Sequence, residues 1–409
     1  MALAKLFGKK TTQLTDEVDL GSTAFFQDPY PTYELLRNNQ PVAAVKPAGH
    51  LLTRHGDILS ALASKDLRNA PSRFSVLNKK NADRYEAARL ANNILPFIDP
   101  PGNTIRRQCL IRSVRAQLDI WQPSLEGVAA RQMELFLQGD SEDVIEKYAS
   151  PLSLNLMCDF IGFENPARNH YKDLSDAFFY LFAPLSDAEK FEQVNNRLAR
   201  FRSELHQLLE LRRANPKADL ISKLISAEHE SEGLSEDEII DSCMLVFADG
   251  VENVEAGVAN VVAAFYQDRD AQEMFHSNEM SLEQLVSEGL RLQTPAQFVP
   301  RIACRDMEIS GVEIAAETPV FLSLASGNRD TEVFEAAEKM LSGRSAQDLL
   351  TFGRGAHSCI GSRLASLQIG AAVKHVIGFG LTPKIPLSKI RFKSRLAHRW
   401  PTHYPMTKP

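Results

Sequence analysis

The spacing of hydrophobic positions changes along the chain near Asp99. Before this residue, short apolar runs such as PVAAV and HLLTR predict strands mixed with helical segments. After it, the pattern is mostly helical, in segments longer than a simple repeat of strand and helix gives. We expect one mainly α domain over residues 1–409 with a smaller β region, its β-containing part at about 1–100 and its helical part at about 101–409.

Three segments carry clear helix signals. The residues DPPGN precede a helix that runs through TIRRQCLIRSVRAQL. A capping box from Ser235 to Glu238 opens a second helix, which continues through IIDSCMLVFADGVENVEAGVANVVAAFYQ. A third helix contains LEQLVSEGLRLQ, and the strand-like run TPVFLSLA follows it. The second helix is long and mostly apolar, so we expect it to cross the core.

Four residues interrupt the apolar pattern in the middle of this second helix: Asp249, Gly250, Glu252 and Asn253. A glycine inside a helix costs about 1 kcal/mol relative to alanine. An acidic side chain among apolar residues is costly unless it is paired or hydrated. The middle of the helix therefore departs from what a purely structural core helix would contain.

Composition and charge exclude several classes of protein. The 409 residues are 44% hydrophobic and carry a net charge of −6, which disfavours nucleic acid and anionic membranes as partners. Five scattered cysteines without a CxxC pair disfavour a disulfide framework or a structural zinc site and fit a reducing compartment. The apolar run at the N-terminus is too short to span a bilayer. We expect a cytoplasmic protein that is not in a membrane.

The loop FGRGAHSCIG, residues 352–361, contains the strongest candidate chemistry. It allows four interpretations: a turn with a buried free cysteine, a catalytic thiol with His357 as base, a zinc site, and a thiolate ligand to haem iron. Papain-like and caspase-like signatures are absent, and no nearby pair completes a zinc site. The haem interpretation explains more residues, because Gly353, Gly355 and Gly361 would permit close approach of a flat macrocycle. Phe352 would shield the sulfur from water, and a helix beginning after Cys359 would lower its pKa.

The same loop, FGRGAHSCIGSRLA, resembles the haem-binding loop of the cytochrome P450 superfamily. The resemblance extends over most of the chain, through DPPGN, the acid-bearing second helix, EGLR, PRIACRD and ASGNRD in the order of the family. It implies the cytochrome P450 fold and a haem b cofactor whose iron is bound by Cys359. The length and the lack of a membrane anchor resemble the soluble bacterial members.

Several other roles are implied by this resemblance. His357, Arg301, Arg107 and, less strongly, Asn103 would contact the haem propionates. Asn103 stands where the family often has a histidine. Glu288 and Arg291 lie three residues apart on a helix and would form a structural ion pair. Arg106, Arg107, Arg112 and Arg115 are interpreted either as a solvated face or as a docking patch for an acidic electron carrier.

One position departs from the pattern of family members that cleave dioxygen. These members typically have a threonine after the acid, and the two side chains relay protons. Here the run is Gly250, Val251, Glu252 and Asn253, so an amide replaces the alcohol. Asp249 also replaces a residue that is usually small and apolar. Either protons arrive through water or a substrate hydroxyl, the enzyme does not insert oxygen in the ordinary way, or Asn253 is simply tolerated.

The substrate pocket is expected to be apolar or aromatic. The candidate lining residues are Phe74, Val76, Leu77, Phe178, Phe179, Gln297, Phe298, Val299 and Leu396.

The expected function is oxidation of an apolar or aromatic small molecule by O2 in specialised metabolism, by hydroxylation or epoxidation. Ferredoxin and ferredoxin reductase would supply two electrons, because the chain has no flavin domain or cluster-binding cysteine run. Radical coupling of phenols is one alternative, and a non-catalytic haem sensor or electron-transfer protein is another.

Overall fold

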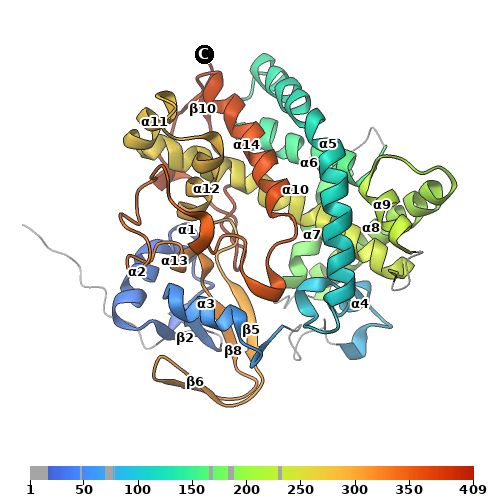
Figure 1. Cartoon of the computed structure of the whole chain (residues 1–409), viewed down its shortest axis with the longest axis horizontal. Helices are drawn as coiled ribbons and strands as arrows, with labels where there is room; N and C mark the ends of the chain where they lie inside the picture. The colour runs from blue at the N-terminus through green and yellow to red at the C-terminus, as the bar shows by residue number, and fades with distance from the viewer. Residues whose placement is uncertain are drawn as a thin grey trace, which may run out of the picture.

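Helices form most of the protein, and its largest β-sheet lies at one end (Figure 1). The computed structural model describes residues 17–46, 48–69, 77, 79–164, 169–182, 188–228 and 233–409. The mainly α fold class expected from the sequence is confirmed.

The largest sheet combines strands from two distant parts of the chain, in the order β1-β2-β3-β8-β5-β4. Strand β8 runs parallel to β3 with His50 opposite Val320, and antiparallel to β5 with Arg301 opposite Val320. The β structure therefore does not end near residue 100. The strands are β1 Val18–Asp19, β2 Val42–Lys46, β3 His50–Leu52, β4 Leu67–Arg68, β5 Val299–Ala303, β6 Met307–Ile309, β7 Val312–Ile314, β8 Pro319–Leu322, β9 Thr382–Pro383 and β10 Met406–Thr407.

One group of helices lies beside this sheet, and the other helices form the rest of the molecule (Figure 1). Beside the sheet are α1 Thr23–Gln27, α2 Tyr30–Asn39, α3 His55–Ala63 and α13 Leu324–Gly327. The other helices are α4 Glu86–Ala91, α5 Thr104–Gln138, α6 Ser150–Ile161, α7 Asn169–Phe178, α8 Ala188–Ala214, α9 Leu220–Glu228, α10 Glu236–Gln267, α11 Arg269–His276, α12 Leu282–Leu292 and α14 Ser362–Gly378.

Helix α10 crosses the core, as its apolar pattern predicted, and packs against α6, α7, α12 and α14. The capping box at its start is present, with the Ser235 hydroxyl accepting from the Glu238 N–H. Close packing of two helices explains the glycine at position 250, because a Cβ there would lie 2.5 Å from the Met157 sulfur of α6. The glycine that weakens the helix therefore lets α6 approach it closely.

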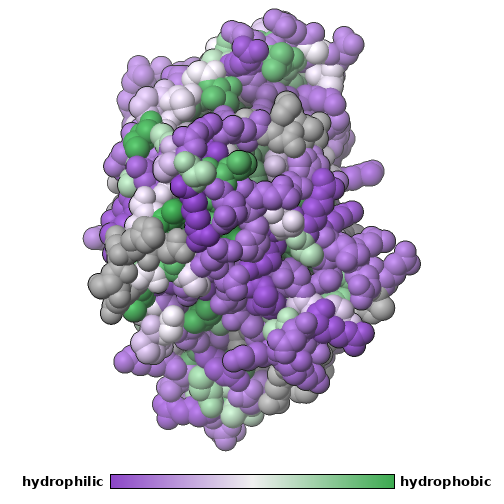
Figure 2. Space-filling model, turned by 90° about the vertical axis from the view of Figure 1, so that its right-hand side faces the viewer, coloured by the Kyte–Doolittle hydropathy of each residue, from purple (hydrophilic) through white to green (hydrophobic). Residues whose placement is uncertain are grey.

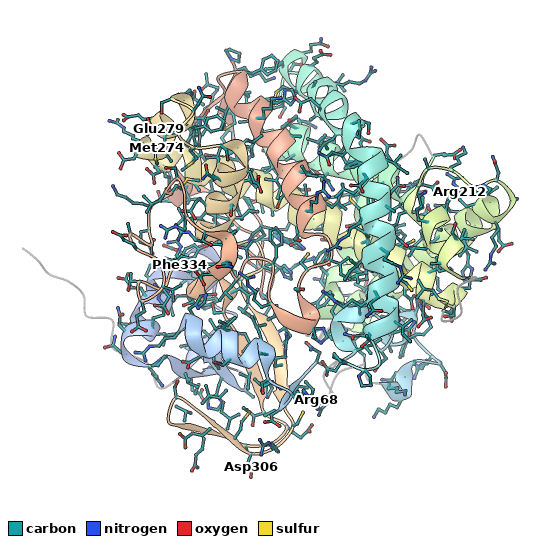
Figure 3. All side chains as sticks on the ribbon, in the orientation of Figure 1. Arg68, Arg212, Met274, Glu279, Asp306 and Phe334 are labelled. Atoms are coloured by element: carbon teal, nitrogen blue, oxygen red, sulfur yellow. The ribbon has the colours of Figure 1, made fainter. Side chains whose placement is uncertain are left out.

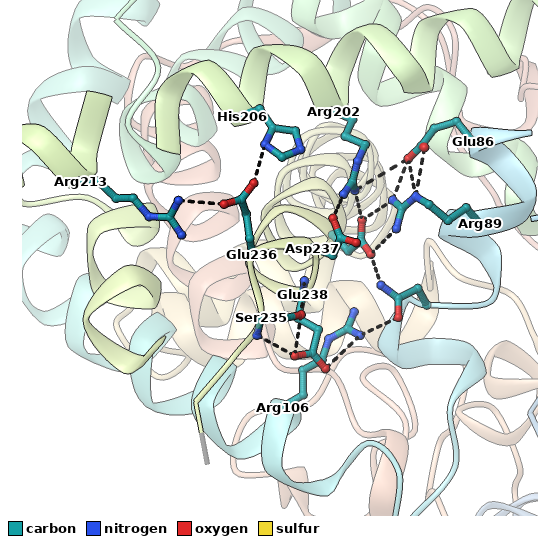
Figure 4. A network of polar contacts seen from close by, with 12 residues as sticks. Glu86, Arg89, Arg106, Arg202, His206, Arg213, Ser235, Glu236, Asp237 and Glu238 are labelled. Carbon is teal, nitrogen blue, oxygen red and sulfur yellow. Dashed lines mark hydrogen bonds and ion pairs between the residues drawn. The ribbon is translucent and has the colours of Figure 1, made fainter. Parts of the chain in front are cut away.

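A buried network of charges fixes the beginning of α10 against its neighbours (Figure 4). The fully buried carboxylate of Asp241 accepts from Arg89 of α4 at 2.6 Å and from Arg202 of α8 at 2.9 Å. Such a group is stable in the interior only when its oxygens are paired and hydrogen-bonded. The network therefore joins three helices that lie far apart in the sequence.

The surface is mainly hydrophilic on the face shown in Figure 2, with apolar residues in small separate groups. Within the described residues, none of the helices combines the length and the apolar character needed to cross a bilayer.

A second buried ion pair ties α12 to the segment that precedes the glycine loop. Arg291 donates from Nε to Glu288 at 2.8 Å, and both side chains are almost completely buried. Its other nitrogens donate to backbone carbonyls of Asn328, Ala337 and Lys339. Phe334, labelled in Figure 3, lies beneath the same guanidinium at 5.4 Å. One side chain therefore satisfies several loop carbonyls at once.

Replacing Glu288 by glutamine should destabilise the holoprotein by about 3–5 kcal/mol, because it leaves the Arg291 charge buried and uncompensated. Chemical unfolding monitored by circular dichroism measures this free energy. Lys374→Ala is the matched control, since it removes the exposed pair with Glu126 and should cost less than about 1 kcal/mol. Equal stability of the two variants would contradict the structural role of the pair.

Candidate functional site

A partly open cavity of about 380 Å³ lies between α10, α5, strand β5 and the glycine loop. It brings together residues that are spread from Leu62 to His398 in the sequence. The residues proposed from the sequence that line it are Arg107, Phe179, Asp249, Gly250, Asn253, Phe298, Val299, Arg301, Phe352, Gly353, His357, Cys359, Gly361 and Leu396.

Other proposed site residues lie elsewhere. Phe178 is fully buried in the core, next to Phe179, which does line the cavity. Leu77 is also a core residue, and the Gln297 side chain donates to the Thr294 carbonyl beside the cavity. Phe74 and Val76 lie outside the described residues.

The glycine loop presents its cysteine to the cavity through tight backbone turns. Gly353 and Gly355 have φ values of +64° and +72°, a conformation that side chains disfavour. The Cys359 N–H donates to the Phe352 carbonyl at 2.8 Å and closes the turn. Helix α14 begins three residues after Cys359. The sequence TFGRGAHSCIGS thus folds into a loop with its cysteine sulfur on the cavity wall.

The surroundings of Cys359 keep its free thiol protonated. Cys359 is exposed to the cavity, but the protein atoms packed around it desolvate the sulfur and raise its pKa to about 12, and the charge of Asp249 adds to this. A backbone N–H of Gly361 and the Arg107 guanidinium act in the opposite direction. A bound metal removes the proton from a coordinating thiol outright. The site therefore suits a sulfur that becomes a thiolate only on binding a metal.

Cationic side chains gather beside this sulfur. Arg107 donates to the Ser358 carbonyl at 2.5 Å and to its hydroxyl at 3.0 Å. His357 Nε2 lies 2.9 Å from Asp99, and burial lowers the pKa of this imidazole. Burial also lowers the pKa of Arg301 to about 10, and its side chain donates to the carbonyl of the adjacent Pro300 at 2.8 Å. These groups are placed to receive an anion at the cavity edge.

The residues present fit a haem. A single cysteine sulfur on the cavity wall, that of Cys359, suits an iron whose other ligands come mainly from a macrocycle. Arg107, Arg301 and His357 would hold the propionates. Asn103, also proposed from the sequence, occupies the N-cap position of α5 without a side-chain capping bond and is not among the residues that line the cavity. It is nearly fully buried, and its amide nitrogen has no hydrogen-bond partner.

Glu252 points away from the cavity. Its carboxylate lies 2.9 Å from Lys172 of α7 and 3.5 Å from Lys393. Burial by itself would raise the pKa of Glu252, but these lysines and Arg395 hold it below its usual range. Glu252 therefore remains a charged carboxylate on the side of α10 that faces away from the cavity.

Asn253 faces the cavity with a fixed amide orientation. The indole N–H of Trp400 donates to its Oδ1 at 3.2 Å. An indole N–H is a donor only, so the amide oxygen must face Trp400. The NH2 group of Asn253 is then available to donate a hydrogen bond to a molecule in the cavity. Asn253 is therefore a hydrogen-bond donor at this site.

Sequence reasoning missed the residues that hold Glu252 and Asn253. Lys172, Lys393 and Trp400 are remote from α10 in the sequence. His398 was also missed, although it lines the cavity and its ring packs 4.5 Å from that of Trp400. Burial lowers the pKa of His398 to about 4, so it is neutral near pH 7. The run HRW directly after Leu396 and Ala397 was the available signal.

The four arginines near the start of α5 do not form one surface. Arg106 is buried and faces Glu238 at 4.0 Å, and Arg107 faces the cavity. Only Arg112 and Arg115 of the four are exposed. Successive residues of a helix are rotated by about 100°, so a basic run divides between two faces.

The Cytochrome P450 family model matches residues 166–378, just over half of the chain. Among curated proteins, a putative cytochrome P450 133B1 of Xylella fastidiosa is 26% identical and covers 87% of this chain and 89% of its own length. A vitamin D(3) 25-hydroxylase of Pseudonocardia autotrophica is also 26% identical, over 92% of each chain.

Solved structures share the fold at low identity. The crystal structure of CalO2 matches with a TM-score of 0.87 and 21% identity, over 97% of this chain and 99% of that one. P450BioI, solved in complex with an acyl carrier protein ligated to hexadec-9Z-enoic acid, matches with a TM-score of 0.84 and 22% identity, over 95% and 99%. With the family match and the cysteine loop, these findings identify the chain: it belongs to the cytochrome P450 family, whose members are monooxygenases with a haem cofactor.

Proposed function

We propose that this enzyme inserts one oxygen atom of O2 into an apolar or aromatic small molecule in specialised metabolism, by hydroxylation or epoxidation. Two electrons and two protons reduce the second oxygen atom to water. The observation that carries the proposal is the single cavity that has the Cys359 sulfur on one wall and Asp249 and Asn253 of α10 on another. When bound, a haem with a thiolate ligand supplies the chemistry that activates dioxygen.

The cavity wall supports an apolar or aromatic substrate. Phe97 and Phe182 are stacked with ring centroids 5.2 Å apart, and Phe179 and Phe298 also line the space. Leucine, valine and isoleucine side chains fill most of the remaining wall. Enclosure of this kind favours a ligand that buries apolar surface.

Separate electron-donor proteins, a ferredoxin and its reductase, are part of the proposal. Arg112 and Arg115 are exposed on α5, the helix whose Arg107 contacts Ser358 beside Cys359. Exposed arginines attract an acidic partner and increase its association rate. The pair Arg112 and Arg115 therefore marks a face where an electron donor could approach the cysteine side of the cavity.

Radical coupling is a second candidate, favoured by Asn253. An amide donates hydrogen bonds but is a poor proton donor, so the acid–alcohol relay of Glu252 is interrupted at this position. In coupling, two aromatic rings lose one hydrogen each and form a bond. Together with two external electrons and two protons, the hydrogens reduce both oxygen atoms to water.

The reduced protein should show the red-shifted Soret band of a thiolate ligand on exposure to carbon monoxide. Cys359→Ser should lose this band, because a hydroxyl does not replace the thiolate ligand. Cys304→Ser, which removes an exposed thiol that is not among the cavity residues, is the matched control and should keep it. A Cys359→Ser protein with an unchanged spectrum would exclude the proposed ligand.

Reconstitution with a generic ferredoxin pair, labelled dioxygen and a panel of phenols and terpenoids distinguishes the two reactions. Insertion adds one labelled oxygen atom to the product, whereas coupling gives a dimer that lacks two hydrogens and carries no label. Asn253→Thr should increase labelled product, because it restores the alcohol of the relay. No change in product or rate with this variant would refute the relay argument.

Trp400→Phe should reduce product formed per electron pair about fivefold, because loss of a neutral hydrogen bond of about 1 kcal/mol frees the Asn253 amide to rotate. The assay compares product with the hydrogen peroxide that uncoupled turnover releases. In an Asn253→Ala background the same tryptophan substitution should have no further effect. Additive losses in the double variant would mean that Trp400 acts only through packing.

A further inference from the structure

Asp249 is a half-buried acid on the cavity wall, and no other described residue pairs with its carboxyl. It lies on α10 one turn before Asn253 and faces the same cavity. No hydrogen bond or ion pair links its carboxyl to another described residue, and burial raises its pKa to about 7. A carboxylate in such a position is costly unless a partner compensates it.

Three buried acids of the described chain contrast with Asp249. Glu252 is paired with Lys172, Glu288 with Arg291, and Asp241 with Arg89 and Arg202. Each of these three carboxylates has a cation from another position within hydrogen-bond reach. Asp249 has no such partner and faces the cavity, so its carboxyl is available to a molecule that enters there.

The cations that line the cavity have other partners. Arg107 donates to Ser358, and His357 contacts Asp99. Together with Arg301 they lie on the side of the cysteine loop and would be used by the propionates of a bound haem. His398, also in the wall, is neutral near pH 7 because burial lowers its pKa to about 4. None of these four side chains forms a hydrogen bond or ion pair with Asp249 in the described structure.

Aromatic rings surround the same space. Phe97, Phe179, Phe182 and Phe298 line it. Faces of aromatic rings attract cations, and the attraction is strongest where water is excluded. A carboxylate and aromatic faces in one enclosure therefore favour a positive charge and disfavour an anionic ligand.

We infer that Asp249 is a binding residue for a cationic nitrogen, so that the substrate is an apolar molecule that carries a protonated or quaternary amine. This inference rests on the proposed function, because it takes the cavity to be the substrate site. The apolar body would pack on the phenylalanines while the charged nitrogen lies against the carboxylate. Asp249 thus selects among substrates by charge.

Two probes that differ only in charge test this inference on the holoenzyme. One is (4-phenylbutyl)trimethylammonium, and the other is its neutral isostere, in which a carbon atom replaces the nitrogen. A quaternary nitrogen has no lone pair, so it does not ligate iron. Calorimetry should give a Kd about tenfold lower for the cation than for the isostere. In Asp249→Asn the two Kd values should become equal within about threefold.

Two further variants separate charge selection from a change in folding. Asp249→Glu keeps the charge and should keep the preference for the cation. Glu134→Gln removes an equal charge from the exposed surface of α5 and should leave both Kd values unchanged. The carbon monoxide spectrum of each variant reports whether the haem site is intact.

The outcomes distinguish this inference from the proposed function. Equal binding of the two probes to the unmodified enzyme, or a preference that survives in Asp249→Asn, would overturn the inference and leave the proposed function standing. Failure of both probes to bind would also overturn the inference, whereas the proposed function is decided separately by the carbon monoxide spectrum and the labelled-dioxygen assay.

Discussion

The presentation of one thiol to a cavity by a glycine loop is the constraint on which the rest of this structure depends. The pKa of Cys359 is raised to about 12, so the side chain by itself is a neutral thiol. The left-handed glycines and the Phe352 carbonyl hold it in place, and Gly361 directs an N–H at the sulfur. Only a bound iron makes a thiolate favourable here. Binding of the iron and deprotonation of the Cys359 thiol are therefore coupled.

Helix α10 divides its polar residues between the protein and the cavity. Glu252 faces lysines behind the helix, and the Asn253 oxygen is held by Trp400. Lys393 and Trp400 belong to one C-terminal segment, so the same stretch of chain sets the position of both groups. Asp249, one turn earlier, has its carboxyl directed to the cavity and lacks such support. One helix thus carries a fixed acid, an oriented amide and an acid available to a ligand.

Sequence reasoning was most successful where a signal is local. The capping box at Ser235, the course of α10 through the core, the three-residue spacing of Glu288 and Arg291 and the family itself are all confirmed. It was least successful at the pocket wall. Phe178 and Phe179 are adjacent and chemically identical, yet only Phe179 lines the cavity. Composition does not distinguish two such residues, because the rotation of the segment decides which one faces the cavity.

The amino-acid sequence alone specified helix starts, the conformation of the glycine loop and pairs within one helix, because each depends on residues a few positions apart. The folded chain decided which charges meet. Lys393 reaches Glu252 across 141 residues and Trp400 reaches Asn253 across 147, and no local pattern encodes such contacts. The lack of a partner for Asp249 is likewise a result of the tertiary structure, because it depends on all the side chains that pack around the carboxylate.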